Sequence, residues 1–89
     1  MKAIVTVVGK DQVGIIAAVC NKLAQYNVNV LDISQTVMQG YFTMMMVVDV
    51  SGCEIPLAEL AQKCEEKGRE MGLSIRLQRE DIFEAMHRV

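Results

Sequence analysis

The hydrophobic pattern of this chain switches between the spacing of strands and the spacing of helices. Residues 2–8 are apolar at both parities, which is typical of a strand buried on both faces. From Gly14 onward the apolar residues recur every three or four positions, so we predict a helix that ends near Tyr26 and Asn27. The stripe that this helix should bury consists of Ile15, Ile16, Val19, Cys20 and Leu23.

Two further strands should form a hairpin. Residues 28–39 alternate apolar and polar side chains, which predicts a half-buried strand at the edge of a sheet. Residues 41–50 are apolar at both parities and include the run Met44-Met45-Met46, so we predict a central strand there. The intervening turn, Gln39-Gly40, is too short for any other connection. The apolar parity of the edge strand holds Leu31, Ile33 and Val37.

The last third of the chain repeats the order of helix and strand. Pro56 suits the first turn of a second helix, and Gly72 should end it. Residues 73–78 alternate again, as an edge strand does, and residues 80–89 form a short amphipathic pattern. The apolar side of that final helix should hold Ile82, Phe83, Met86 and Val89.

This order predicts an α+β fold, a ferredoxin-like βαββαβ sandwich. It has a four-stranded antiparallel sheet, two helices on one face and a short C-terminal helix. The first and third strands are central in this topology, in agreement with their two apolar faces. Because parallel crossovers are right-handed, both long helices lie on one face, and the other face needs a different cover. We expect a second protomer to supply it, with the C-terminal helix contributing.

Composition narrows the function. The 89 residues are enough for one domain, and 52% are hydrophobic while only 22% are charged, which favours self-association as a homodimer. A net charge of −2 and the absence of tryptophan and of a basic stripe argue against nucleic acid as a partner. No apolar run approaches the roughly 18 residues of a membrane span, and no export signal precedes Gly9, so we expect no membrane association and a cytoplasmic protein.

Side chains suited to metal binding or catalysis are sparse. Cys20, Cys53 and Cys64 form no Cys-x-x-Cys pair, and we expect Cys20 and Cys64 to be buried and Cys53 to be the more accessible. His87 has no partner at ligand spacing and should be an exposed helix residue. No Ser-His-Asp or Cys-His arrangement is evident, so we expect no enzyme, no metal and no cofactor.

The turn after the first strand is the candidate ligand site. A strand that turns on glycine and opens a helix leaves backbone N–H groups free, and these favour an anion. The turn reads Val8-Gly9-Lys10-Asp11-Gln12-Val13-Gly14-Ile15, and the entry into the second strand reads Asn27-Val28-Asn29-Val30, followed by Ile33 and Gln35. Together these two motifs resemble an ACT domain, the small regulatory module that senses amino acids and related metabolites. The resemblance covers residues 1 to about 80, with 81–89 as a helical tail, and extends to small stand-alone ACT proteins related to the glycine-cleavage repressor.

The resemblance implies a homodimer that holds a ligand, expected to be an amino acid, where the protomers meet. The N–H groups from Gln12 to Ile15 would hold its carboxylate, while Asp11 and the Asn29 carbonyl would hold its ammonium group. Gln12-Val13 stands where many family members have Arg-Pro. The ligand-binding set carried over is Asp11, Gln12, Val13, Gly14, Ile15 and Asn29.

Simpler roles remain open for the same residues. Asp11 fits the N-cap of the first helix, Gly14 a packing position, and Asn29 a turn. The alternative function is a ligand-free module for dimerisation or protein interaction, and another regulatory protein stays open as a partner. A small phosphatase of this fold would need an arginine in the turn after the first strand, and a metallochaperone would need two cysteines there. The turn contains neither an arginine nor a cysteine.

Overall fold

The computed structural model describes residues 1–87 and contains the predicted elements in the predicted order. The side chains of Phe83, Met86 and His87 and the whole of Val89 lie outside the described part, and so do the predictions made for them. The elements are β1 (Lys2–Lys10), α1 (Ile15–Gln25), β2 (Asn29–Met38), β3 (Tyr41–Asp49), α2 (Leu57–Met71), β4 (Ser74–Arg79) and α3 (Glu80–His87).

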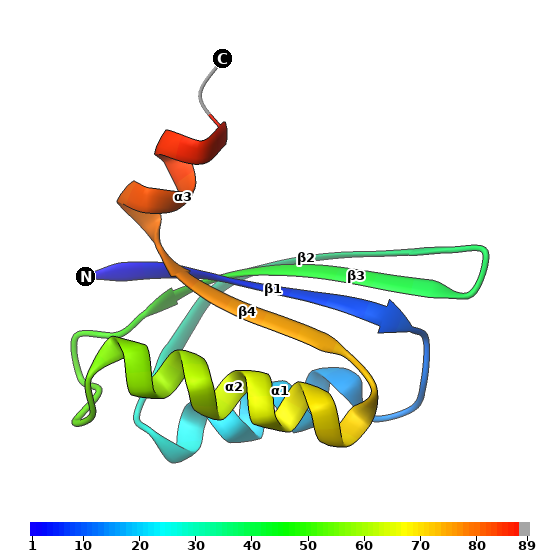
Figure 1. The fold of residues 1–89 in the computed structure, drawn as a ribbon, viewed down its shortest axis with the longest axis horizontal. Helices are drawn as coiled ribbons and strands as arrows, with labels where there is room; N and C mark the ends of the chain where they lie inside the picture. The colour runs from blue at the N-terminus through cyan, green and yellow to red at the C-terminus, as the bar shows by residue number, and fades with distance from the viewer. Residues whose placement is uncertain (88–89) are drawn as a thin grey trace.

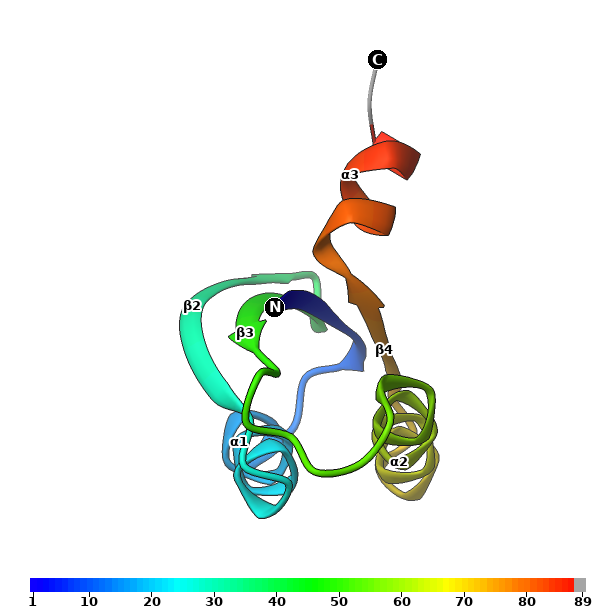
Figure 2. The same ribbon diagram turned by 90° about the vertical axis from the view of Figure 1, so that its left-hand side faces the viewer.

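The sheet confirms the ferredoxin-like topology. Its strands run in the order β2-β3-β1-β4, and each neighbouring pair is antiparallel, so the two strands with apolar residues at both parities are central. Helices α1 and α2 lie side by side on one face (Figures 1 and 2). Gln39 and Gly40, with φ of 50° and 81°, form the tight turn between β2 and β3.

The core lies between the helices and the inner side of the sheet. It is formed by alternate residues of β1, β3 and β4 together with one stripe from each long helix. Met44 and Met46 are fully buried in this layer while Met45 faces the other side, 40% exposed, as expected for a central strand. The largest fully buried side chains are Leu23, Met44, Met46, Leu60, Val5, Val7, Val19 and Val48.

Three details of α1 differ from the prediction. The helix begins at Ile15 with Gly14 as its N-cap, so Asp11 is not the cap; it lies too far back in the loop. The buried stripe is narrower than predicted, because Ile16 is 37% exposed. Cys20 is half-buried rather than buried, as is Cys53, so Cys64 is the one buried thiol of the three.

The burial of strand β2 differs more strongly from the prediction than that of α1. Only Val30 is half-buried, and every later residue of the strand is exposed, so the predicted burial of Leu31, Ile33 and Val37 is wrong for a single chain. A bulge between Val30 and Asp32 takes Leu31 out of the register. Beyond it the hairpin of β2 and β3 continues past the end of the helices (Figure 1), so no helix covers the inner side of β2 there.

The C-terminal helix leaves the other face of the sheet largely uncovered. Helix α3 projects away from the sheet on the side opposite to α1 and α2, and it contacts only β1 and β4 (Figures 1 and 2). Ile4, which pairs with Gln78 close to the start of α3, is 7% exposed, whereas Val8 on the same face is 44% exposed. One chain therefore covers only the end of this face.

Helix α2 packs against β4 at a position where only glycine fits. A Cβ atom on Gly68 would lie 2.7 Å from the Leu73 carbonyl oxygen and 3.1 Å from Cγ1 of Ile75. The Leu73 N–H also donates a hydrogen bond of 2.7 Å to the Gly68 carbonyl, which fixes the end of the helix against the strand. The backbone at this contact has little room to move.

We predict that Gly68→Ala lowers the free energy of unfolding by about 1–3 kcal/mol, because the added methyl group overpacks the contact with β4. At an unconstrained helix position the same change stabilises by up to about 1 kcal/mol, so the sign of the effect is diagnostic. Urea unfolding measures it, with Gln62→Ala on the exposed side of α2 as the control. A stabilised Gly68→Ala protein would show that α2 and β4 are further apart.

We predict that stability falls between about pH 9 and pH 11 because of Cys64. This thiol is 2% exposed, and burial raises its pKa from 9.0 to about 11. In that window the unfolded thiol loses its proton while the folded one keeps it, so the unfolded state is favoured as the pH rises, by at most about 2 kcal/mol. Urea unfolding from pH 8 to pH 11 should show a shallower decline for Cys64→Ala. Equal declines for the two proteins would contradict the burial of the thiol.

Candidate functional site

The turn between β1 and α1 presents unpaired backbone donors. Gly14 adopts φ +90°, a left-handed conformation that suits glycine, and it begins the helix without a side-chain cap. The first hydrogen bond of the helix runs from the Ala18 N–H to the Gly14 carbonyl, at 2.9 Å. The N–H groups of Ile15, Ile16 and Ala17 therefore have no acceptor within the helix, and they lie at the positive end of its dipole.

A hollow of about 260 Å³ opens beside these donors. Its polar lining residues are Asp11, Gln12 and Gln35, and the first residues of α1 line it beside them. Val37 and Phe42 supply an apolar wall from β2 and β3. The complete lining is Asp11, Gln12, Gly14, Ile15, Ile16, Ala17, Gln35, Val37 and Phe42.

Two hydrogen bonds hold the turn in place. The Asp11 N–H donates to the Gly40 carbonyl at 2.8 Å, which ties the turn to the tip of the β2–β3 hairpin. The Gln12 Nε2 donates to the Met71 carbonyl at 3.0 Å, which ties it to the end of α2. The Gln12 side chain is thus engaged with α2, and the turn is positioned by both halves of the fold.

The hollow lies on the helix side of the sheet, at its β2 edge. Val37 pairs with Phe42 and Gln35 pairs with Met44, and cross-strand partners share a face. Phe42 and Met44 belong to the core, so Gln35 and Val37 face the helix side as well. Because β2 is an edge strand, the hollow is open to solvent along that side.

These groups can bind a small polar molecule that carries both a negatively and a positively charged group. Donors at a helix start favour an anionic group, the carboxylate of Asp11 favours a cation, and Val37 and Phe42 favour an apolar substituent. The lining contains no serine, cysteine or histidine. Within residues 1–87 no three His, Cys, Asp or Glu side chains are grouped so as to hold a metal ion. In the same range, no helix has the length and apolar character needed to cross a membrane.

The predicted site residues are only partly brought together. Asp11, Gln12, Gly14 and Ile15 line the hollow, but Val13 is fully exposed and is not part of the lining. Asn29 pairs with Asp49 at the first residue of β2, whereas Asp11 lies near the other end of that strand, where Met38 pairs with Tyr41 and Tyr41 pairs with Lys10. One chain therefore does not bring Asn29 near Asp11.

Sequence reasoning missed Ile16, Ala17, Gln35, Val37 and Phe42 as lining residues. A signal for Gln35 was present, because it is the polar residue that stands between Ile33 and Val37 on the parity they share. A polar side chain placed between apolar ones on the inner side of a strand indicates a polar neighbour there. No comparable signal marked Ala17, since its role depends on the backbone alone.

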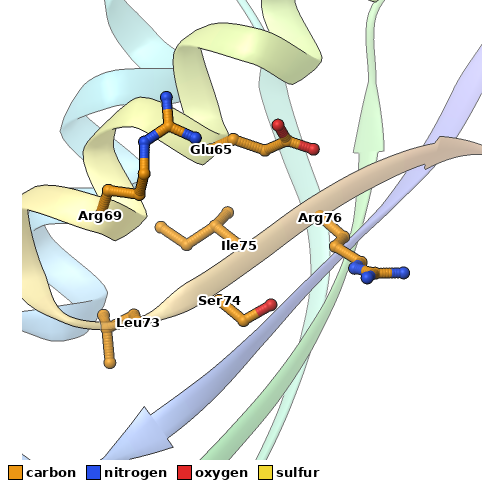
Figure 3. Close-up of a pocket in the computed structure, with 6 residues that line it drawn as sticks. All are labelled: Glu65, Arg69, Leu73, Ser74, Ile75 and Arg76. Carbon is orange, nitrogen blue, oxygen red and sulfur yellow. The ribbon is translucent and has the colours of Figure 1, made fainter.

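A second hollow, of about 210 Å³, lies between α2 and the exposed edge of β4. Figure 3 shows Glu65 and Arg69 on the helix and Arg76 on the strand, with charged ends that point apart rather than toward one centre. These groups do not converge on a ligand, and the hollow beside α1 is the better candidate.

Comparison with known proteins identifies the family to which this fold belongs. The sequence profile of the ACT domain matches residues 2–78. A UPF0237 protein of Bifidobacterium longum is 54% identical over 88 residues, which cover 99% of this chain and 98% of that protein. An ACT domain protein from Streptococcus pneumoniae superposes with a TM-score of 0.83 at 47% identity, over 98% of each chain. A protein described as a glycine cleavage system transcriptional repressor shares the fold, with a TM-score of 0.73 at 20% identity over 86% of this chain and 44% of that one.

Proposed function

The chain belongs to the ACT-domain family, and from this premise we propose that it is a regulatory module that binds a free amino acid in the hollow at the start of α1. ACT domains are regulatory ligand-binding modules. The proposed role is sensing and not catalysis, in the cytoplasm, where free thiols such as those of this chain are kept reduced.

The observation that carries the proposal is the meeting of three kinds of group in one hollow. The carboxylate of an amino acid would accept hydrogen bonds from the N–H groups of Ile15, Ile16 and Ala17. Its ammonium group would face Asp11, and its side chain would lie against Val37. A volume of about 260 Å³ favours a small amino acid.

We also propose that the protein is a homodimer formed along β2. This edge strand is ten residues long and exposes Leu31, Ile33 and Val37, with relative exposures of 46%, 39% and 53%. Natural proteins rarely leave such an apolar edge unpaired. Because Gln35 and Val37 of the same strand line the hollow, a copy paired along β2 would cover its open side.

This arrangement gives Asn29 a role that a single chain does not. If two copies of residues 29–38 pair antiparallel with full overlap, Asn29 of the partner subunit lies opposite Met38. That end of β2 adjoins the hollow and Asp11, so the main-chain carbonyl of the partner's Asn29 would come near the site from across the interface, while its side chain would face away from the helices as Met38 does. A ligand-free dimerisation module with the same β2 interface is the alternative.

We expect at least one amino acid from a panel of the twenty to raise the melting temperature and to give a binding isotherm in titration calorimetry. Asp11→Asn should weaken that binding by about 10- to 100-fold, since a charged hydrogen bond to the ammonium group is lost. Glu66→Gln on the exposed side of α2 is the matched control. No response to any amino acid would favour the ligand-free module.

We expect light scattering at micromolar concentration to give at least twice the 9.9 kDa mass of one chain. Ile33→Lys should halve the measured mass, because a charged side chain on an edge strand opposes strand pairing. Gln62→Lys, which adds the same charge to α2, should leave the mass unchanged. A protein of one-chain mass before any substitution would refute the dimer.

A further inference from the structure

A further hollow, of about 450 Å³, lies between the two long helices. Helices α1 and α2 lie side by side in one layer, and Figure 2 views them almost end-on. Helix α1 supplies most of the lining and α2 supplies one residue. We call this space the inter-helix hollow, and its lining residues are Ala18, Asn21, Lys22, Gln25 and Lys67.

The lining of the inter-helix hollow is positively charged. It holds two ammonium groups and two side-chain amides, and it contains no carboxylate. Lys22 is the one charged residue of α1, so this helix brings no acidic side chain to the hollow. The whole chain has a net charge of −2, and a hollow with two positive charges is therefore a local departure from an acidic protein.

The ammonium group of Lys22 is directed toward α2. Ala18, Lys22 and Gln25 are four and three residues apart, so they share one side of α1. Burial raises the pKa of the Cys64 thiol on α2, and the charge of Lys22 lowers it in part, so this charge acts across the gap between the helices. The Lys22 Nζ also lies 5.7 Å from the centre of the Tyr26 ring, a cation–π contact that restricts its position.

The positive charge of the two lysines is only weakly compensated within the chain. Among residues 1–87, Lys22 has no ion-pair partner. Lys67 is half-buried, and its Nζ lies 3.5 Å from a carboxylate oxygen of Glu70, whose side chain is 69% exposed. Exposed ion pairs of this kind contribute little to stability, so Lys67 can turn from Glu70 to a ligand at small cost.

We propose that the inter-helix hollow binds a small molecule that carries a phosphate group. Lys22 and Lys67 approach the hollow from two helices, and their two charges match the charge of about −2 that a phosphate monoester carries near pH 7. Lysine is a common phosphate ligand in proteins. The amides of Asn21 and Gln25 can donate hydrogen bonds to phosphate oxygens or to the rest of the molecule. A volume of about 450 Å³ exceeds that of a phosphate group alone and leaves room for an organic part.

A purely structural role for Lys22 does not account for the whole arrangement. Lys22 lies in the last turn of α1, where its charge also stabilises the helix. That role needs neither the second ammonium group nor the two amides. The same end of α1 repels an anion, but by less than one charged hydrogen bond contributes, so the two lysines decide which charge the hollow prefers. The inter-helix hollow shares no lining residue with the amino-acid hollow, so either ligand can bind without the other.

Titration calorimetry on the full chain tests this proposal with pairs of compounds that differ only in the phosphate group. The pairs are AMP with adenosine and glycerol phosphate with glycerol, and pyrophosphate is a further probe. At least one phosphate compound should bind with a dissociation constant of about 1 mM or lower, and its phosphate-free counterpart should not bind. Lys22→Gln and Lys67→Gln should each weaken this binding by about 10-fold or more, because each removes a charged hydrogen bond. The control Lys2→Gln removes the same charge at the exposed start of β1 and should leave binding unchanged.

Nuclear magnetic resonance locates the bound compound in the unsubstituted protein. The side-chain amide signals of Asn21 and Gln25 should shift as the phosphate compound is added, and those of Gln35 in the amino-acid hollow should not. Failure of every phosphate compound to bind, equal binding of a phosphate-free counterpart, or unchanged binding in both lysine variants would overturn the proposal. Because Asp11→Asn alters only the amino-acid hollow, it should leave phosphate binding unchanged, which separates a failure of this site from a failure of the amino-acid site.

Discussion

One layer of helices can cover only one face of a four-stranded sheet, and this constraint shapes the whole molecule. Both long helices lie on the inner side, where Met44, Met46 and Val5 are fully buried between them and the strands. The close approach of α2 to β4 at Gly68 fixes that layer in place. The exposed apolar residues that face the other way, such as Val8 and Met45, or that lie beyond the ends of the helices, can be covered only by something outside the single chain.

The candidate site lies where the helix layer ends. The hairpin of β2 and β3 runs past the helices, so Val37 has a helix start beside it instead of a helix side above it. A helix start brings donors and a positive dipole end, whereas a helix side would bring apolar side chains. The same geometry therefore leaves the hollow unfilled and makes it polar. Gly14 makes this arrangement possible, since its left-handed conformation lets the chain enter α1 directly from the turn.

The order of elements, the central and edge strands and the glycine turns were predictable from the sequence, because each depends on local chemistry or on the parity of one strand. The burial of β2 was not predictable from the sequence. Parity shows that Ile33 and Val37 share a face, but whether a helix covers that face depends on lengths in three dimensions. Asn29 was placed with Asp11 by motif alone, and only the register shows that they lie at opposite ends of the sheet within one chain.

The sequence also suggested a single seam that would cover the bare face and enclose the ligand, and the structure separates these two features. The hollow adjoins the β2 edge on the helix side, whereas Val8 and Met45 lie on the face of the sheet away from the helices. A ligand held between two copies at β2 would strengthen that contact by the same factor by which the contact strengthens ligand binding. A contact through that bare face would share no residue with the hollow and would not be coupled to the ligand in this direct way. Amino-acid binding would then change association at the β2 edge only, so that a small domain would report ligand concentration without changing its own fold.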